Sequence, residues 1–250
     1  MKIELNKVIF EEKEDIGYVV INDPPANKMT TLFLTELSEL VTRYIAHSKV
    51  KGIIITGNGR HYSSGVEVDR LKELVSNQAS FDSDGNLVTY PMGHQQDRNS
   101  FDFFYNHNIP VISAINGFCI GAGLELALCS HIRICGNGST LGLPESTFGF
   151  IPALSGTLRC VELCGLGKAL ELVLSGETFS AEDALKMGIV DGIVSKKETL
   201  SYCEELMKYI LQSKMTYSKT NIKMYLKNFN EIYLSIKNKQ GRGYITCGKM

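Results

Sequence analysis

Two glutamates lie in short stretches of apolar residues, glycine and proline, where a carboxylate is least expected. Glu125 lies inside the run GLELAL, and Glu145 follows a proline in the run LGLPE. Taken alone, Glu125 fits a carboxylate stabilised by the start of a helix, and Glu145 fits an acid on a surface loop. Taken together, they could share one pocket and one water molecule, and each charge would raise the pKa of the other. Such a pair can supply one acid and one base for general acid–base catalysis.

Backbone N–H groups in two glycine-containing turns complement these acids. Gly121 and Gly123 bracket Ala122 where an apolar helix is expected to start, and N–H groups point outward from a helix N-terminus. The run YSSGV at 62–66 follows a buried strand, and its glycine permits a bend that frees the N–H of Val66. If these two N–H groups converge, they form an oxyanion hole for a carbonyl that gains negative charge.

Several other chemistries are excluded by what the sequence lacks. A dinucleotide fingerprint fails because Leu126 occupies its third glycine position, and neither a P-loop nor a GxSxG nucleophile turn occurs. The five histidines show no metal-ligand spacing and the seven cysteines form no CxxC pair, so we expect no metal site. The cysteines are odd in number and most have apolar neighbours, which favours a reduced, cytoplasmic compartment. The net charge of −1 argues against nucleic-acid binding. No apolar run is long enough to predict a membrane span or a signal peptide.

The elements that must position these residues alternate between strand and helix patterns, which predicts an α/β fold with crossover connections. Short apolar runs predict strands at 8–10, 18–21, 52–56, 111–115 and 132–135. Helical spacing predicts helices after a capping Thr30 or Thr31, before Pro110, at 124–129, at 169–174, at 180–186 and after 199.

Two segments have compositions that set them apart. Residues 75–92 are polar and lack periodicity, which predicts a mobile loop that could serve as a lid. The last fifty residues carry nine Lys/Arg and three Asp/Glu. This positive excess fits either solvated helix faces or attraction to a phosphate-bearing ligand or an acidic carrier.

Five stretches, taken in order, resemble the crotonase (enoyl-CoA hydratase/isomerase) superfamily. They are NDPPAN at 22–27, residues 61–68, the run from Ile109 through Glu125, the run from Leu143 through Arg159, and ALKMGIV at 184–190. The resemblance covers residues 8–195 and implies a spiral core of ββα units at 1–195. It further implies a C-terminal helical trimerisation region at 196–250, and hence a homotrimer or a hexamer.

The resemblance also implies roles for individual residues. Glu125 and Glu145 match the catalytic glutamates, and the N–H groups of Val66 and Ala122 match the oxyanion donors. The implied substrate is an acyl-CoA or acyl-carrier-protein thioester, with CoA or phosphopantetheine as part of the substrate and no separate cofactor or metal. Its pantetheine would run along the substrate-binding residues Ala26, Lys28, Met29, Ser64, Gly65 and Gly121.

Relatives that hydrate enoyl thioesters keep both glutamates, so the resemblance favours a hydro-lyase that adds water reversibly across the 2,3-double bond. Double-bond isomerisation, carrier-linked dehydration and thioester hydrolysis on the same scaffold are alternatives. A non-catalytic thioester-binding protein is an alternative of another class.

The chain departs from the family's pattern at four places. They are His131 where relatives usually carry Asp, Ala122 in place of a commoner Gly, ALSG at 153–156 in place of a more Gly-rich loop, and QGRGYITC at 240–247 in place of an EGxxAFxEKR-like closing segment. Because that closing segment usually helps to cover the ligand, its absence leaves both CoA and an acyl carrier protein open as the carrier.

Overall fold

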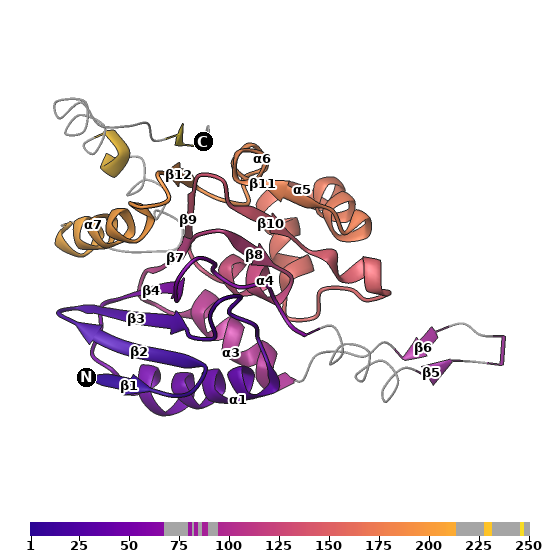
Figure 1. Cartoon of the computed structure of the whole chain (residues 1–250), viewed down its shortest axis with the longest axis horizontal. Helices are drawn as coiled ribbons and strands as arrows, with labels where there is room; N and C mark the ends of the chain where they lie inside the picture. Colours follow the sequence, from indigo (N-terminus) through magenta and orange to yellow (C-terminus); the bar gives the residue numbers. More distant parts are fainter. Residues whose placement is uncertain are drawn as a thin grey trace.

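The computed structural model describes residues 1–67, 80–81, 83–84, 87–89, 95–213, 228–231 and 246–247. In this part of the chain, a mixed sheet of strand order β1-β2-β3-β4-β7-β9-β12-β13 forms the centre, a smaller sheet has the order β11-β10-β8, and β5 pairs with β6 (Figure 1). The strands are β1 (Lys2–Glu4), β2 (Val8–Lys13), β3 (Ile16–Ile21), β4 (Gly52–Gly57), β5 (Ser80–Phe81), β6 (Leu87–Thr89), β7 (Val111–Ile115), β8 (Phe118–Ile120), β9 (Ile132–Gly136), β10 (Thr140–Gly142), β11 (Thr178–Ser180), β12 (Gly192–Val194) and β13 (Thr246–Cys247).

Helices flank both faces of the central sheet. They are α1 (Thr31–Glu39) with its continuation η1 (Leu40–Tyr44) and η2 (Ile45–His47), α3 (Gln95–Asn106), α4 (Ala122–Leu128), η3 (Pro144–Phe148), α5 (Gly156–Ser175), α6 (Ala181–Met187) and α7 (Thr199–Gln212). Of the two capping candidates, Thr30 is the N-cap of α1, because its hydroxyl accepts a hydrogen bond from the N–H of Phe33 at 3.2 Å.

The central strands are buried on both faces, as their unbroken apolar runs predict. In β4, Ile53 and Ile55 belong to the core shared with α1, α3, α4 and α5. Ile54 points the other way and packs with Leu206 and Met207 of α7. This alternation follows from the two-residue period of a strand, and it encloses the sheet between two helical layers.

A second layer of short segments lies beside the sheet and holds the turns that follow its strands. Ser63, which follows β4, pairs in parallel with Cys119 of β8. The strand β8 pairs in parallel with β10, where Ile120 lies opposite Gly142. Because neighbouring parallel segments end at the same edge, the residues that follow Ser63, β8 and β10 come together in space. These are the stretches that carry Val66, Ala122 and Glu145.

The α/β fold and the strands predicted at 8–10, 18–21, 52–56, 111–115 and 132–135 are confirmed. The helix predicted at 124–129 begins earlier, at Ala122, and the one predicted at 169–174 is the end of a longer α5. The strands β1, β8, β10, β11 and β12 were not predicted, because each has only three residues and too few positions to show a period.

Two predicted segments are described only in part. Within 75–92, predicted as a loop, the described residues include the short strands β5 and β6, and the remainder lies outside the described residues. Of the predicted helical region at 196–250, the structure describes α7, a helical turn at 228–231 and β13. Most of the basic tail therefore also lies outside the described residues.

Candidate active site

The segment that precedes α1 is fixed against the turn that follows β4. The carbonyl of Ala26 accepts a hydrogen bond from the N–H of Ser64 at 2.9 Å, and the N–H of Met29 donates to the carbonyl of Gly65 at 2.9 Å. The buried Asn27 adds a third contact between the two segments, because its backbone carbonyl accepts a hydrogen bond from Ser63 Oγ at 2.7 Å. These contacts bring five of the six predicted substrate-binding residues, at 26–29 and 64–65, to one place.

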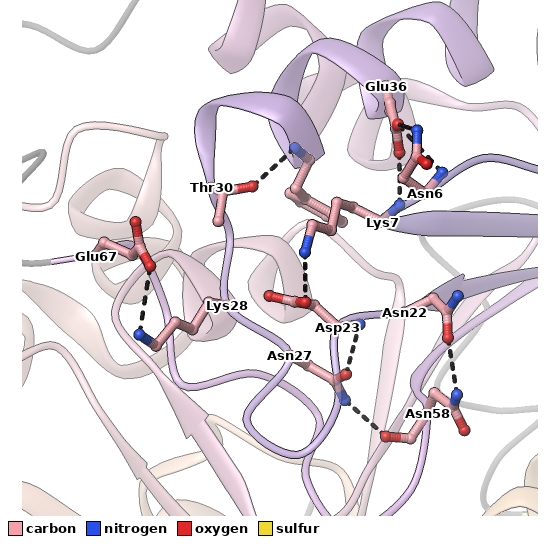
Figure 2. A network of polar contacts seen from close by, with 11 residues as sticks. Asn6, Lys7, Asn22, Asp23, Asn27, Lys28, Thr30, Glu36, Asn58 and Glu67 are labelled. Atoms are coloured by element: carbon pink, nitrogen blue, oxygen red, sulfur yellow. Dashed lines mark hydrogen bonds and ion pairs between the residues drawn. The ribbon is translucent and has the colours of Figure 1, made fainter.

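Figure 2 shows the polar contacts around this segment, which also involve residues of neighbouring segments. The amide of Asn27 accepts from the N–H of Asp23 at 3.0 Å and donates to the carbonyl of Asn58 at 3.0 Å. Lys28 lies apart from these groups and pairs with Glu67 at 3.3 Å, with both side chains about half exposed. Met29 is fully buried, and its N–H is already bonded to Gly65, so its part in the site is to hold the segment in place.

The turn at Gly65 lies directly against the start of α4. A Cβ placed on Gly65 would lie 2.7 Å from the carbonyl oxygen of Ile120 and 3.5 Å from the nitrogen of Ala122. The φ of Gly65 is +85°, a conformation that glycine adopts most readily. The predicted oxyanion donors thus come from two turns in close contact. Ala122 is the first residue of α4, so its N–H has no partner within that helix.

Glu125 is buried in α4, and its carboxylate is held by a third segment. Its Oε1 accepts two hydrogen bonds of 2.8 Å, from the N–H groups of Leu154 and Gly156. Burial raises the pKa of Glu125, and these two N–H groups oppose the rise because they stabilise the charged form. One donor therefore lies in the loop before α5 and the other is the first residue of α5, whereas one interpretation of the sequence places the stabilising group at the start of α4.

Glu145 is the second residue of η3 and is also buried. Its Oε2 has no hydrogen-bond partner within the described part of the chain. Burial raises its pKa, and the negative charge of Glu125 raises it further. The two carboxylates therefore titrate as one electrostatic unit, in which Glu125 loses its proton first because two backbone N–H groups stabilise its charged form.

Gly121 links this carboxylate to the oxyanion turn. A Cβ built on Gly121 would lie 2.7 Å from Oε1 of Glu145, and its φ of +54° again suits glycine. The N–H of Gly121 donates to the carbonyl of Gly142 at 2.8 Å, which ties the end of β8 to the end of β10. Glu145 therefore lies against the residue that precedes Ala122.

Three contributors to the site were missed from the sequence. Leu154 and Gly156 supply the N–H groups on Glu125, and Arg98 of α3 bonds the carbonyl of Ala153. The glycine at 156 was a usable signal, because it lies in a stretch already singled out as atypical. The sequence around Arg98 has no comparable feature that would indicate its contact with Ala153.

The departure at His131 has a structural role. Its Nδ1 accepts a hydrogen bond from the N–H of Val111 at 3.1 Å, and its other ring nitrogen lies 3.1 Å from the carbonyl of Tyr105. His131 thus joins the end of α3 to the start of β7. Among the described residues, no group of His, Cys, Asp or Glu side chains could hold a metal ion, and no helix has the length and apolarity to cross a membrane.

Replacing Gly156 by alanine should displace Glu125. The new Cβ would lie 2.6 Å from Cγ and 2.8 Å from Oε1 of that side chain, so one of the two must move. If Glu125 is the catalytic glutamate that the sequence resemblance implies, kcat for hydration of crotonyl-CoA should fall about tenfold to a hundredfold, since small misplacements of a catalytic group have effects of that size. Steady-state kinetics on the purified variant checks this.

Gly167 provides the control, in the part of α5 that follows the kink at Gly165. A Cβ there meets nothing within 4 Å, so Gly167→Ala should leave kcat unchanged and raise the free energy of unfolding by up to about 1 kcal/mol. Equal kcat values for the two alanine variants would contradict the role given to Gly156.

Comparison with known proteins agrees with this architecture. The sequence profile described as Enoyl-CoA hydratase/isomerase matches residues 11–240. A Bacillus subtilis (strain 168) protein named "Probable enoyl-CoA hydratase" is 30% identical over an alignment of 253 positions that covers 95% of this chain and 94% of that protein. A Clostridium acetobutylicum protein named "Short-chain-enoyl-CoA hydratase" is 30% identical over 84% of this chain and 77% of its own length.

A solved structure shares the fold. The Thermobifida fusca YX protein assigned as an enoyl-CoA hydratase and crystallised in complex with CoA superimposes with a TM-score of 0.70 at 22% identity, covering 95% of each chain. The crotonase-like fold implied by the sequence motifs is therefore confirmed. The chain belongs to the enoyl-CoA hydratase/isomerase family.

Proposed function

We propose that the protein adds water reversibly across the 2,3-double bond of an enoyl thioester. The observation that carries this proposal is the pair of buried, electrostatically coupled glutamates, Glu125 and Glu145. Addition of water needs a group that activates the water and a group that protonates the substrate, and a coupled pair that holds one proton offers both.

The two carboxylates have different environments, which supports a division of roles. Two backbone N–H groups favour the charged form of Glu125, so it orients and activates the water whose oxygen bonds to C3. Burial and the charge of Glu125 keep Glu145 protonated, so it gives its proton to C2. The proton that the water loses stays with the pair, which holds one proton before and after the reaction.

The thioester carbonyl would accept hydrogen bonds from the N–H groups of Val66 and Ala122. Such donors stabilise the enolate-like charge that builds on this oxygen while the C3–O bond forms. Support comes from the contact between the turn at Gly65 and the nitrogen of Ala122. The substrate's pantetheine would follow the backbone at 26–29 and 64–65, where the two segments lie together.

CoA is the proposed carrier, because the Thermobifida fusca relative is described in complex with CoA. The test is incubation of the protein with crotonyl-CoA, followed by loss of the absorbance of the conjugated thioester. Retained absorbance with crotonyl-CoA, but loss with crotonyl groups on an acyl carrier protein, would transfer the proposal to the other carrier. Retention with both, and gain of absorbance with a 3-enoyl-CoA, would replace hydration by isomerisation.

The protein is also proposed to assemble as the trimer, or pair of trimers, that the family resemblance implies. Large apolar side chains stay exposed on and near η3 and α5, and an assembly would bury such a surface. They are Phe148, Ile151, Leu158, Leu166, Leu170 and Leu174. Sedimentation equilibrium tests the assembly, and a monomer at micromolar concentration would contradict it.

A further inference from the structure

Arg98 connects α3 to the loop that holds Glu125. It lies in the first turn of α3, half-buried, and its Nε and Nη2 both donate to the carbonyl oxygen of Ala153, at 3.3 and 3.0 Å. A planar guanidinium that gives two donors to one oxygen fixes that oxygen in direction as well as in distance. The contact joins residues 55 positions apart in the sequence.

The loop after Ala153 needs such a restraint. Between the two N–H donors to Glu125 stands Ser155, with a φ of +80°, a region that non-glycine residues enter only at a cost. This left-handed residue turns the N–H groups of Leu154 and Gly156 toward the same carboxylate oxygen. Without an outside contact, the serine would favour a different backbone conformation, and the two donors would separate.

We propose that Arg98 is a positioning residue for the reaction, which it serves by holding Ala153 so that the loop's N–H groups fix the Glu125 carboxylate. This inference rests on the proposed function for its kinetic consequence. Its structural part stands on the chain of contacts from Arg98 through Ala153 to Glu125.

The charge of Arg98 acts in the same direction as its hydrogen bonds. Among the groups that face Glu125, Arg98 lowers its pKa, whereas Glu145 from η3 is coupled to it as a like charge. Cys129 at the end of α4 and Cys160 of α5 also lie close. Burial raises the pKa of both thiols to about 12, so they stay neutral at physiological pH. Removing Arg98 should therefore raise the pKa of Glu125.

The test is the substitution Arg98→Met, which keeps the length of the side chain and removes its donors and charge. We expect kcat to fall about tenfold or more while KM changes less than about twofold, because the substrate contacts stay and the catalytic geometry loosens. The acidic limb of the kcat–pH profile should move to higher pH. Arg98→Lys restores the charge without the planar fork, so it should return the acidic limb toward its original pH and recover only part of kcat.

Two comparisons make the result specific to Glu125. Arg43→Met removes an exposed arginine of η1 that pairs with Glu39 one turn earlier, so it should change neither kcat nor the pH profile. In a Glu125→Gln background, Arg98→Met should lower kcat by less than about twofold further, because the two residues act through one group. A full, independent loss in that background would overturn the proposal.

A readout without turnover separates this inference from the proposed function. With ¹³C-labelled glutamate carboxyl groups and the Glu125→Gln variant for assignment, the titration of Glu125 can be followed directly by NMR. Arg98→Met should move that titration to higher pH even if crotonyl-CoA is not hydrated. Hydration of crotonyl-CoA by the unmodified protein, together with an unchanged Glu125 titration and kcat in Arg98→Met, would refute the role of Arg98 and leave the proposed function standing.

Discussion

Glu145→Gln should lower kcat for enoyl thioester hydration by about 10²–10³-fold, with little change in substrate binding, because it removes a positioned acid–base group and keeps its shape. Glutamine cannot give a proton to C2, while its size preserves the contact with Gly121. Stopped-flow or steady-state kinetics with crotonyl-CoA checks the loss. Glu171→Gln, on an exposed side chain of α5, is the control and should be fully active.

The same variant should be more stable than the parent protein at alkaline pH. The folded-state pKa of Glu145 lies above its value in the unfolded chain, so the folded protein binds more protons between those two values, and its stability falls as pH rises through that window. Glutamine carries no charge and avoids this loss. Urea unfolding at pH 5 and pH 8 should show a stability gain for Glu145→Gln that is larger at pH 8. A variant that is inactive and less stable at both pH values would point to misfolding and not to lost chemistry.

Much of the fold could be predicted from the sequence because local patterns determine it. The short β-branched run of β4 and the apolar run of β7 favour strands buried on both faces, and Thr30 has a side chain of the kind that caps a helix. The two glutamates stood out for the same local reason, since each is a lone acid in an apolar stretch.

The partners of those glutamates could not be predicted, because they depend on which distant segments become neighbours. The strands β8 and β10 have three residues each, and only their parallel pairing places Gly121 beside Glu145. The hydrogen bond from Arg98 to Ala153 joins a side chain to a main-chain carbonyl. Every residue carries such a carbonyl, so the residue type at 153 cannot indicate that it accepts this bond. For the same reason, the sequence alone suggests that Glu125 is stabilised by the start of its own helix, whereas its hydrogen-bond donors are the N–H groups of Leu154 and Gly156.

Ala122→Pro should abolish activity, with kcat/KM falling by at least about 10³-fold. Loss of one oxyanion donor alone costs about 10²–10³ in rate, and the proline ring would also occupy the place of the missing hydrogen. The fold should tolerate the change, because proline is favoured at the first position of a helix, where the N–H has no partner within the helix. The preceding residue, Gly121, has no Cβ to clash with the ring. Kinetics and a circular dichroism melting curve on the same sample measure both expectations.

Ala122→Gly distinguishes the effect of the N–H on activity from that of the side chain, because it keeps the N–H donor and removes only the methyl group. We expect it to lose no more than about fivefold in kcat/KM, through the greater freedom of glycine at the start of α4. If Ala122→Pro folds normally and still keeps more than about a tenth of the activity, the thioester oxygen cannot depend on this N–H, since removing a true oxyanion donor has a far larger effect. The carbonyl would then have to be polarised elsewhere, and the role inferred for the contact between the turn at Gly65 and the start of α4 would fall with it.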